Sequence, residues 1–341
     1  MFACHHAIPI SDTSQIGEAR RHAVRLAEEI NLSEAQCGEV AIVVTELATN
    51  LSRYATGGEV LLRPLTDLNG GLEIISIDRG PGMADVARCL QDGYSTGGTP
   101  GNGLGAVHRL SSEFDLYSCP SGTVVFARLL RKSAGPSTGR GFPWGAISRP
   151  APRELVCGDV WRIAQRAEEL SVMIADGLGH GPLAAQAAYE AAGAFDHDPF
   201  APLSAIVATV DARMRGTRGG ALGIARFDAQ AQALKYTGVG NIAASLRSNG
   251  ESASRGLVSH YGTVGVQVRR VQEFEYPCGH GSLLIMHSDG LQSRWSLDPY
   301  PGLAHRHPAL IAATLYRDFS RGRDDVTVAA IRFDAAHVVR R

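Results

Sequence analysis

The strongest chemical signal comes from five aspartates in the C-terminal half of the sequence. They lie at or near the ends of predicted strands: Asp159, Asp176, Asp289, Asp324 and Asp325. If the strands around Ala167 and Glu168 form a hairpin that turns between these two residues, Asp159 lies opposite Asp176. Two carboxylates that close repel each other unless a cation lies between them. Because oxygen ligands without His or Cys favour Mg²⁺ or Mn²⁺ over zinc, we predict a divalent metal site, although a single Asp-Gly pair more often marks a hairpin turn.

A second candidate site begins on a predicted helix in the N-terminal half. Glu46 and Asn50 are four residues apart, so their side chains lie one turn apart on the same face as Arg53. The opposite face carries an apolar stripe made of Cys37, Val40, Ala41, Val44, Leu47, Ala48 and Leu51. A carboxylate beside an amide oxygen suits a general base next to a Mg²⁺ ligand. The alternative is an ordinary solvated helix face.

Two glycine-containing turns follow this helix. Asp78 ends a predicted strand and precedes Gly80 and Gly82, so its carboxylate can accept a hydrogen bond from an adenine amino group where the backbone approaches closely. The segment 97–105, GGTPGNGLG, leads into a predicted helix over 104–110. Its free amides and the helix N-terminus are suited to hold phosphates. Taken alone, each turn is also compatible with a purely structural role.

Both candidate sites need a mixed framework of helices and strands. In the N-terminal half, hydrophobic periodicity predicts helices over 15–30 and 34–55, and strands over 59–64, 72–79, 114–118 and 123–130. In the C-terminal half it predicts strands over 155–163, 170–175, 221–227, 234–237, 266–276, 283–287 and 326–333. Helices are expected there over 183–195, 202–215 and 308–319. The expected fold class is therefore α+β.

The length of 341 residues suggests two domains. The stretch 131–152, RKSAGPSTGRGFPWGAISRPAP, is rich in Gly, Pro, Ser and Arg and shows neither helical nor strand periodicity. We therefore predict one domain over residues 1–131, a linker over 132–152 and a second domain over 153–335.

Composition excludes several classes of function. The chain has 33 Lys and Arg against 34 Asp and Glu, so it lacks the basic surface that nucleic acids or anionic membranes need. Its six cysteines are far apart and form no zinc-binding spacing. No basic leader and no long apolar run is visible, and we expect a cytoplasmic protein.

The order of the N-terminal motifs narrows the function further. ExxxN on a helix, DxGxG after a strand and GxGxG before a helix resemble the three nucleotide-binding boxes of the GHKL ATPase superfamily over about residues 10–130. The segments TELATNLSRYATGGE, DRGPGM and GNGLGAVHRL look most like RsbT and RsbW Ser/Thr kinases, which act on STAS-domain proteins. The resemblance implies a GHKL (Bergerat) α/β sandwich that binds ATP and Mg²⁺.

By the same resemblance, Glu46 would be the catalytic base and Asn50 the Mg²⁺ ligand, while Asp78 would bind adenine. Glycines of the last two boxes would line the nucleotide: Gly80, Gly82, Gly101, Gly103 and Gly105. Thr96, Asn102 and Arg53 remain alternatives for a further phosphate contact.

The C-terminal motifs also form an ordered set: GDVW at Gly158, ADGLGHG at Ala175, TGVGN at Thr237, SDGL at Ser288 and RDDVTV at Arg323. Over about residues 153–334 this set resembles the SpoIIE/RsbX branch of the metal-dependent type 2C phosphatases. The resemblance implies a four-layer αββα sandwich with two Mn²⁺ or Mg²⁺ ions at one end. Water, and no protein side chain, would then be the nucleophile.

In that family pattern Asp176 would bridge both metals and support catalysis. Asp159 and the Gly177 carbonyl would bind one metal, and the other ligands would be Asp289, Asp324 and Asp325. Arg153 and Arg162 are the candidates for a phosphate-binding arginine. His180 is either a proton donor to the leaving oxygen or a cap for the next helix.

Together these resemblances imply a bifunctional partner-switching regulator. Its kinase and phosphatase activities would act on STAS-domain antagonists or stressosome-type phosphoproteins, with a sigma-factor regulator as a further possible partner. The alternative is a phosphatase whose first domain only senses ATP or sequesters a partner. A third reading, a DNA topology or repair ATPase, lacks the basic surface that it would need.

Overall fold

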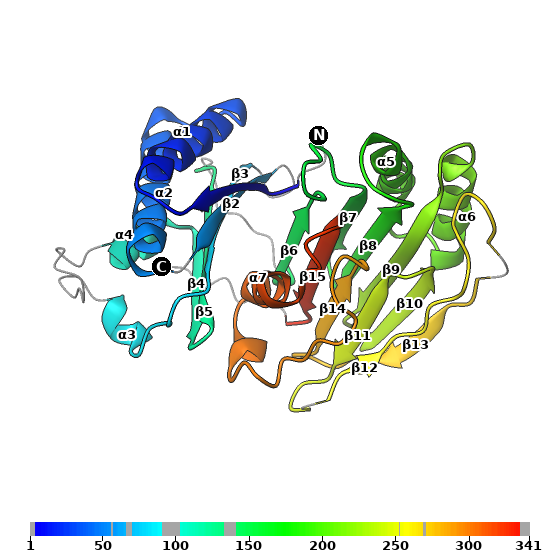
Figure 1. The fold of residues 1–341 in the computed structure, drawn as a ribbon. Helices are drawn as coiled ribbons and strands as arrows, with labels where there is room; N and C mark the ends of the chain where they lie inside the picture. Colours follow the sequence, from blue (N-terminus) through cyan, green and yellow to red (C-terminus); the bar gives the residue numbers. More distant parts are fainter. Residues whose placement is uncertain are drawn as a thin grey trace. The chain divides into compact units, whose positions relative to one another are not determined.

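The computed structural model describes residues 4–55, 57–65, 70–90, 103–132, 141–251, 253–268 and 271–334 (Figure 1). The chain divides into two compact units, His5–Ser137 and Thr138–Arg341, with Cys4 belonging to the second. Within the described ranges, no helix combines the length and the apolar character that crossing a membrane requires.

The first unit is built on a five-stranded antiparallel sheet in the order β1-β2-β3-β5-β4. Its strands are β1 (His6–Ile10), β2 (Gly58–Leu65), β3 (Gly71–Asp78), β4 (Glu113–Cys119) and β5 (Gly122–Leu130). Its helices are α1 (Ser14–Glu29), α2 (Glu34–Tyr54), α3 (Val86–Cys89) and α4 (Gly103–Leu110). The sequence prediction missed β1, a short strand at the sheet edge, where its Pro9 is tolerated.

The helix α2 positions the candidate nucleotide-binding side chains. It begins after Ser33, whose hydroxyl accepts a hydrogen bond from the amide of Gln36 at 3.3 Å. Its apolar face packs into the core between the helices and the sheet. The predicted stripe is wrong in one detail, because Val43 is buried whereas Ala41 is partly exposed.

The second unit contains two five-stranded sheets, with strand orders β13-β10-β9-β8-β7 and β12-β11-β14-β15-β6. The first sheet comprises β7 (Asp159–Arg166), β8 (Glu169–Gly177), β9 (Gly220–Asp228), β10 (Ala233–Val239) and β13 (Phe274–Pro277). The second comprises β6 (Trp144–Arg149), β11 (Ala243–Arg247), β12 (Arg255–Gly256), β14 (Leu283–His287) and β15 (Val326–Arg332).

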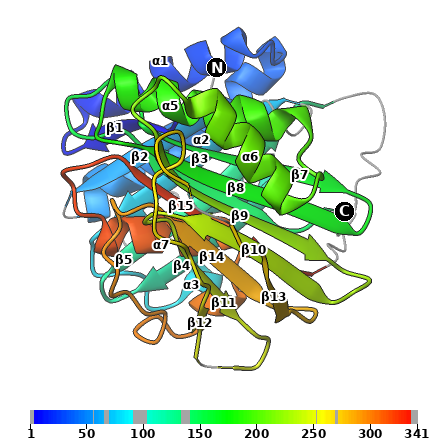
Figure 2. The same cartoon turned by 90° about the vertical axis from the view of Figure 1, so that its right-hand side faces the viewer.

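Helices cover both sheets of this unit. The helix α5 (Pro182–His197) packs on β7 and β8, and α6 (Leu203–Met214) packs beside α5 (Figure 2). The helix α7 (Pro308–Phe319) packs on β6 and β15, after the short 3-10 helix η1 (Leu303–His305). The expected mixed α+β architecture is therefore confirmed.

Several predicted bounds are wrong in this unit. Residues 144–149, expected to be part of a linker, form β6, which pairs antiparallel with β15. The strand expected over 155–163 is shifted to 159–166, and that expected over 266–276 is reduced to 274–277. The strands β11 and β12 were missed. Local composition misled the prediction for β6, because Gly and Pro flank a strand whose partner lies far along the chain.

Because β6 belongs to the second sheet, a fragment that begins at Gly141 is expected to be more stable than one that begins at Arg153. The shorter fragment loses the buried side chains of Trp144 and Ile147 and the β6–β15 hydrogen bonds. We expect it to lose about 5 kcal/mol of unfolding free energy, or to fail to fold. Urea unfolding of the two fragments, with the full chain as control, checks this, and equal midpoints would contradict it.

Candidate metal centre and candidate nucleotide site

The hairpin of β7 and β8 brings two predicted site residues together. Its register pairs Asp159 with Asp176, as the sequence analysis expected. The turn consists of Ala167 and Glu168, and Ala167 has a positive φ of 45°. The two carboxyl-bearing residues are therefore direct cross-strand neighbours.

Glycine at position 158 lets a third segment reach this hairpin end. A Cβ atom on Gly158 would lie 2.6 Å from Oδ2 of Asp325 and 2.8 Å from the Cβ of Ala184. The amide of Gly177 donates a hydrogen bond to the carbonyl of Gly158 at 2.9 Å. Asp325 thus packs against the residue that precedes Asp159.

Two carboxylate oxygens of this cluster are buried without a hydrogen-bond partner among the described residues. Asp159 is 2% exposed, and its Oδ2 accepts a 2.6 Å hydrogen bond from Ser288, while its Oδ1 has no partner. Oδ1 of Asp325 accepts a 2.8 Å hydrogen bond from the amide of Ala151, while its Oδ2 has no partner. A buried acceptor without a donor is costly, so both oxygens are suited to a cation.

The aspartates also raise one another's pKa. Burial, and then the charges of Asp159 and Asp289, raise the pKa of Asp176 to about 9. Burial raises the pKa of Asp159 to about 8, with the charge of Asp325 adding to the effect. The pKa of Asp325 is raised mainly by burial. Such shifts show that the ionised carboxylates lack enough compensating positive charge.

The residues present fit a divalent cation centre. The carboxylate oxygens are the ligands that Mg²⁺ or Mn²⁺ prefers. A bound cation would also reduce the repulsion between the carboxylates and would contact the two buried oxygens that lack a hydrogen-bond partner. Within the described ranges, no three His, Cys, Asp or Glu side chains already stand in the geometry of a formed metal site. The carboxylates of this cluster would supply the ligands of such a cation.

Neighbouring polar residues orient the acids, and sequence reasoning assigned them no role. Ser288 is fully buried, and its hydroxyl accepts a 3.0 Å hydrogen bond from the amide of Thr327 while it donates to Asp159. The side-chain amide of Asn241 donates a 2.8 Å hydrogen bond from Nδ2 to Oδ2 of Asp289. Ser288 and Asn241 lie in the SDGL and TGVGN segments, so the signal for them was present in the sequence.

Two of the other candidates, His180 and Arg162, have side-chain partners. Nδ1 of His180 lies 2.8 Å from Oε1 of Glu154, and α5 is capped at Gly181 without a side-chain hydrogen bond. A capping role for His180 is therefore wrong. Arg162 forms an ion pair with Asp196, at 3.0 Å between Nε and Oδ2. Arg153 has a positive φ of 73°.

The affinity for a divalent cation is expected to increase with pH. In the metal-free protein the raised pKa values of Asp159 and Asp176 favour their protonated forms. The free energy of unfolding that these protonated carboxyls contribute is therefore lost as pH rises from about 4 towards 9. The cation requires the ionised forms, so the rise in melting temperature on adding Mg²⁺ should grow between about pH 6 and about pH 8. Thermal unfolding with and without Mg²⁺ measures it. A stabilisation that does not change with pH would contradict the assignment.

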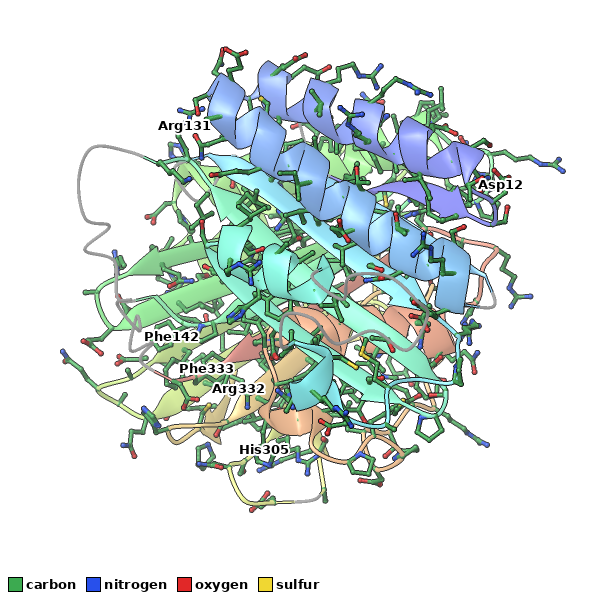
Figure 3. All side chains as sticks on the ribbon, turned by 90° about the vertical axis from the view of Figure 1, so that its left-hand side faces the viewer. Asp12, Arg131, Phe142, His305, Arg332 and Phe333 are labelled. Carbon is green, nitrogen blue, oxygen red and sulfur yellow. The ribbon has the colours of Figure 1, made fainter. Side chains whose placement is uncertain are left out.

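The candidate nucleotide site is formed around α2 and the start of α4. Glu46 and Asn50 are both partly exposed on α2. A Cβ on Gly103 would lie 2.5 Å from Oε2 of Glu46, so this carboxylate lies against the first residue of α4. Gly105 is buried in α4. The structure thus brings Glu46 next to the second glycine-containing turn, and Figure 3 shows α2 and α4 in one view.

Asp78 lies at the end of β3 and is held by backbone amides. Its Oδ1 accepts hydrogen bonds from the amides of Gly80 at 2.8 Å and Thr123 at 3.0 Å. Gly82 has a φ of +75°, and a Cβ there would collide with the carbonyl of Cys119. The remaining predicted residues of this site, Gly101 with the alternatives Thr96 and Asn102, lie outside the described residues.

The comparisons with known proteins agree with both halves of this description. The histidine kinase-like ATPase domain family matches residues 10–129, and the stage II sporulation protein E (SpoIIE) family matches residues 166–334. The chain therefore belongs to the proteins that join a GHKL-like ATPase domain to a SpoIIE-type, type 2C phosphatase domain.

Two curated relatives, both from Bacillus subtilis (strain 168), each match part of the chain. The serine/threonine-protein kinase RsbT is 36% identical over 101 residues, which are 29% of this chain and 76% of RsbT. The phosphoserine phosphatase RsbX is 28% identical over 137 residues, which are 40% of this chain and 68% of RsbX. The chain is thus similar to a named kinase and to a named phosphatase of the same organism.

Solved structures share the fold of more than half of the chain. A chain from a structure of the bacterial stressosome, described as a modular system adapted to control secondary messenger signalling, covers 56% of this chain and 100% of its own length. It has a TM-score of 0.53 and 25% identity. RsbX in complex with magnesium has a TM-score of 0.50 and 19% identity, over 57% of this chain and 97% of its own, and shows the shared fold.

Proposed function

We propose that the chain is a bifunctional regulator that both phosphorylates and dephosphorylates Ser or Thr residues of STAS-domain proteins. The observation that carries the phosphatase half is the aspartate cluster, with its raised pKa values and its two buried oxygens without donors. The kinase half is supported by the position of Glu46 against α4 and by the 36% identity to RsbT.

In the phosphatase half, Asp159, Asp176 and the Gly177 carbonyl would hold one divalent cation. Asp289, Asp324 and Asp325 would hold the second, with Asp176 shared between both. The bound cations would supply the positive charge that activates water and neutralises the phosphoryl oxygens. Ser288 and Asn241 keep Asp159 and Asp289 oriented through the hydrogen bonds described above.

In the kinase half, Asp78 would accept a hydrogen bond from the adenine amino group, and Asn50 would bind Mg²⁺. Glu46 would take the proton from the substrate hydroxyl as it attacks the γ-phosphate. The hydrogen bonds from Gly80 and Thr123 fix the carboxylate of Asp78 at the end of β3. This preorganisation suits a residue that must recognise a base.

STAS-domain antagonists or stressosome-type phosphoproteins are the proposed substrates. RsbT is named a serine/threonine-protein kinase, RsbX a phosphoserine phosphatase, and one structural neighbour comes from a stressosome. A second candidate keeps only the phosphatase active and makes the first unit an ATP sensor or a module that sequesters a partner. It is favoured by the fact that opposed activities on one chain would consume ATP without a net result unless they are regulated.

One experiment distinguishes the bifunctional enzyme from the phosphatase whose first unit only senses ATP or sequesters a partner. The full chain is incubated with radiolabelled ATP, Mg²⁺ or Mn²⁺ and the STAS-domain proteins encoded near it, and label on the protein is followed with time. Transfer followed by release supports the bifunctional enzyme. ATP binding without transfer, together with release from a prephosphorylated STAS protein, supports the sensor. Absence of both transfer and release would refute both forms of the proposal.

A further inference from the structure

A cavity of about 180 Å³ lies at one end of the second sheet of the phosphatase unit. The register places Arg247 of β11 beside Leu283 of β14, and Leu283 beside Arg332 of β15. The aspartates lie at the other end of the same strands, because Asp325 immediately precedes β15, whose last residue is Arg332. Seven residues of strand separate the two, a distance of roughly 23 Å. The cavity is therefore distinct from the metal centre.

Two arginines and a histidine line this cavity. Arg247 and Arg332 occupy the same row across three neighbouring strands, so they lie on the same sheet face about 10 Å apart, within reach of one ligand. His305 of η1 lines the same cavity, and Figure 3 labels it together with Arg332. Asn249 adds an amide from the turn after β11.

Backbone carbonyls hold both guanidinium groups in place. Nε of Arg247 donates a 2.7 Å hydrogen bond to the carbonyl of Glu251, and Nη2 of Arg332 donates a 2.6 Å hydrogen bond to the carbonyl of Arg306. The carbonyl of Glu251 orients the guanidinium of Arg247 without neutralising its charge. Within the described part of the chain, the terminal nitrogens of Arg247 and the side chains of Asn249 and His305 have no hydrogen-bond partner.

The charge and the size of the cavity select the ligand. The residues that line the cavity include two arginines, Arg247 and Arg332, one histidine, His305, and one acid, Glu251. Arginine forks match the oxygens of a phosphate, and a preformed pair gives such an anion several charge-assisted hydrogen bonds. The volume lies below the roughly 300–1,000 Å³ of drug-sized ligand sites, so it suits one phosphate group rather than a whole nucleotide.

We propose that this cavity, the Arg247 pocket, is a binding site for a phosphate monoester or for inorganic phosphate, separate from the metal centre and from the ATP site. Inorganic phosphate and a phosphorylated side chain of a partner protein share this chemistry. Because the pocket residues belong to neither catalytic site, the proposal goes beyond the proposed function and stands or falls separately from it.

The test measures phosphate binding by the full chain in EDTA, at constant ionic strength, so that the metal centre cannot contribute. Three ligands are compared by ³¹P NMR titration or calorimetry: inorganic phosphate, a phosphoserine peptide and, by calorimetry, the same peptide with unmodified serine. The variants are Arg247→Gln and His305→Ala. Arg215→Gln is the matched control, because Arg215 is 73% exposed, lies on a different element and pairs with Asp211.

We expect the wild-type chain to bind inorganic phosphate, the phosphoserine peptide or both, and the serine peptide not at all. Arg247→Gln should weaken binding about tenfold or more, while Arg215→Gln leaves it unchanged. Preference for the peptide would identify a phosphoprotein as the source, and preference for the free ion would identify inorganic phosphate. Circular dichroism verifies that each variant is folded, and His305→Ala provides a second test if Arg247→Gln is not. Failure of the wild type to bind either phosphate ligand, or equal binding by folded wild type and folded Arg247→Gln or His305→Ala, would overturn the proposal.

Discussion

Replacement of Asp176 by Asn is expected to abolish metal-dependent phosphatase activity, with a loss of at least about a thousandfold, equivalent to roughly 4 kcal/mol of transition-state stabilisation. Asn keeps the shape of the side chain but removes a charge that the cations need. The neutral amide also avoids the cost of burying and of protonating a carboxyl whose pKa is raised to about 9 by burial and then by the charges of Asp159 and Asp289. The metal-free variant should therefore be as stable as wild type or more stable near neutral pH, although it is inactive.

Hydrolysis of a phosphoester with Mn²⁺, together with thermal unfolding in EDTA, measures both effects. Asp289→Asn should behave similarly in the activity assay. Glu190→Gln is the control, because the carboxylate of Glu190 on α5 is partly exposed and pairs with Arg213, which belongs to neither candidate site. Full Mn²⁺-dependent activity in Asp176→Asn would contradict the assignment of Asp176 as a metal ligand.

Glu46→Ala is expected to bind ATP normally and to lose phosphoryl transfer by a factor on the order of 10²–10⁴, because a positioned general base contributes about that much. Asp78→Asn should instead weaken ATP binding. An amide at this position can still accept from Gly80 or Thr123, so the fold is retained, but it no longer offers a carboxylate to adenine.

Fluorescent ATP titration and radiolabel transfer to a STAS-domain protein separate the two effects. Glu39→Ala is the matched control on the same helix, because Glu39 pairs with Lys132 at 2.6 Å. Transfer at the wild-type rate in Glu46→Ala would show that another group accepts the proton. Wild-type ATP affinity in Asp78→Asn would contradict the base-recognition role.

Local patterns predicted those parts of the fold whose partners are close in sequence. The β7–β8 register follows from a two-residue turn, and so the pairing of Asp159 with Asp176 was predicted correctly. The helix α7 and the strand β14 have the predicted bounds, since their apolar runs end at clear breaks.

Elements and contacts that depend on distant partners could not be predicted in this way. The strand β6 pairs with β15, which lies about 180 residues later in the chain. The composition of β6 does not indicate that partner. The hydrogen bond from Ser288 to Asp159 spans 129 positions. Its existence depends on how the two sheets of the unit meet, which is a tertiary property.

The strand β6 links the start of the described range 141–251 to the candidate metal centre. The chain leaves β5 at Leu130, enters β6 at Trp144 and, two residues after β6 ends, donates the amide of Ala151 to the carboxylate of Asp325. Arg149 is also paired with Val326, the residue next to Asp325. The hydrogen bond from Ala151 and the pairing of Arg149 therefore connect β6 directly to a carboxylate that we propose as a metal ligand. A substitution in β6 that weakens its pairing with β15 is therefore expected to displace Asp325 and to lower the affinity for a divalent cation.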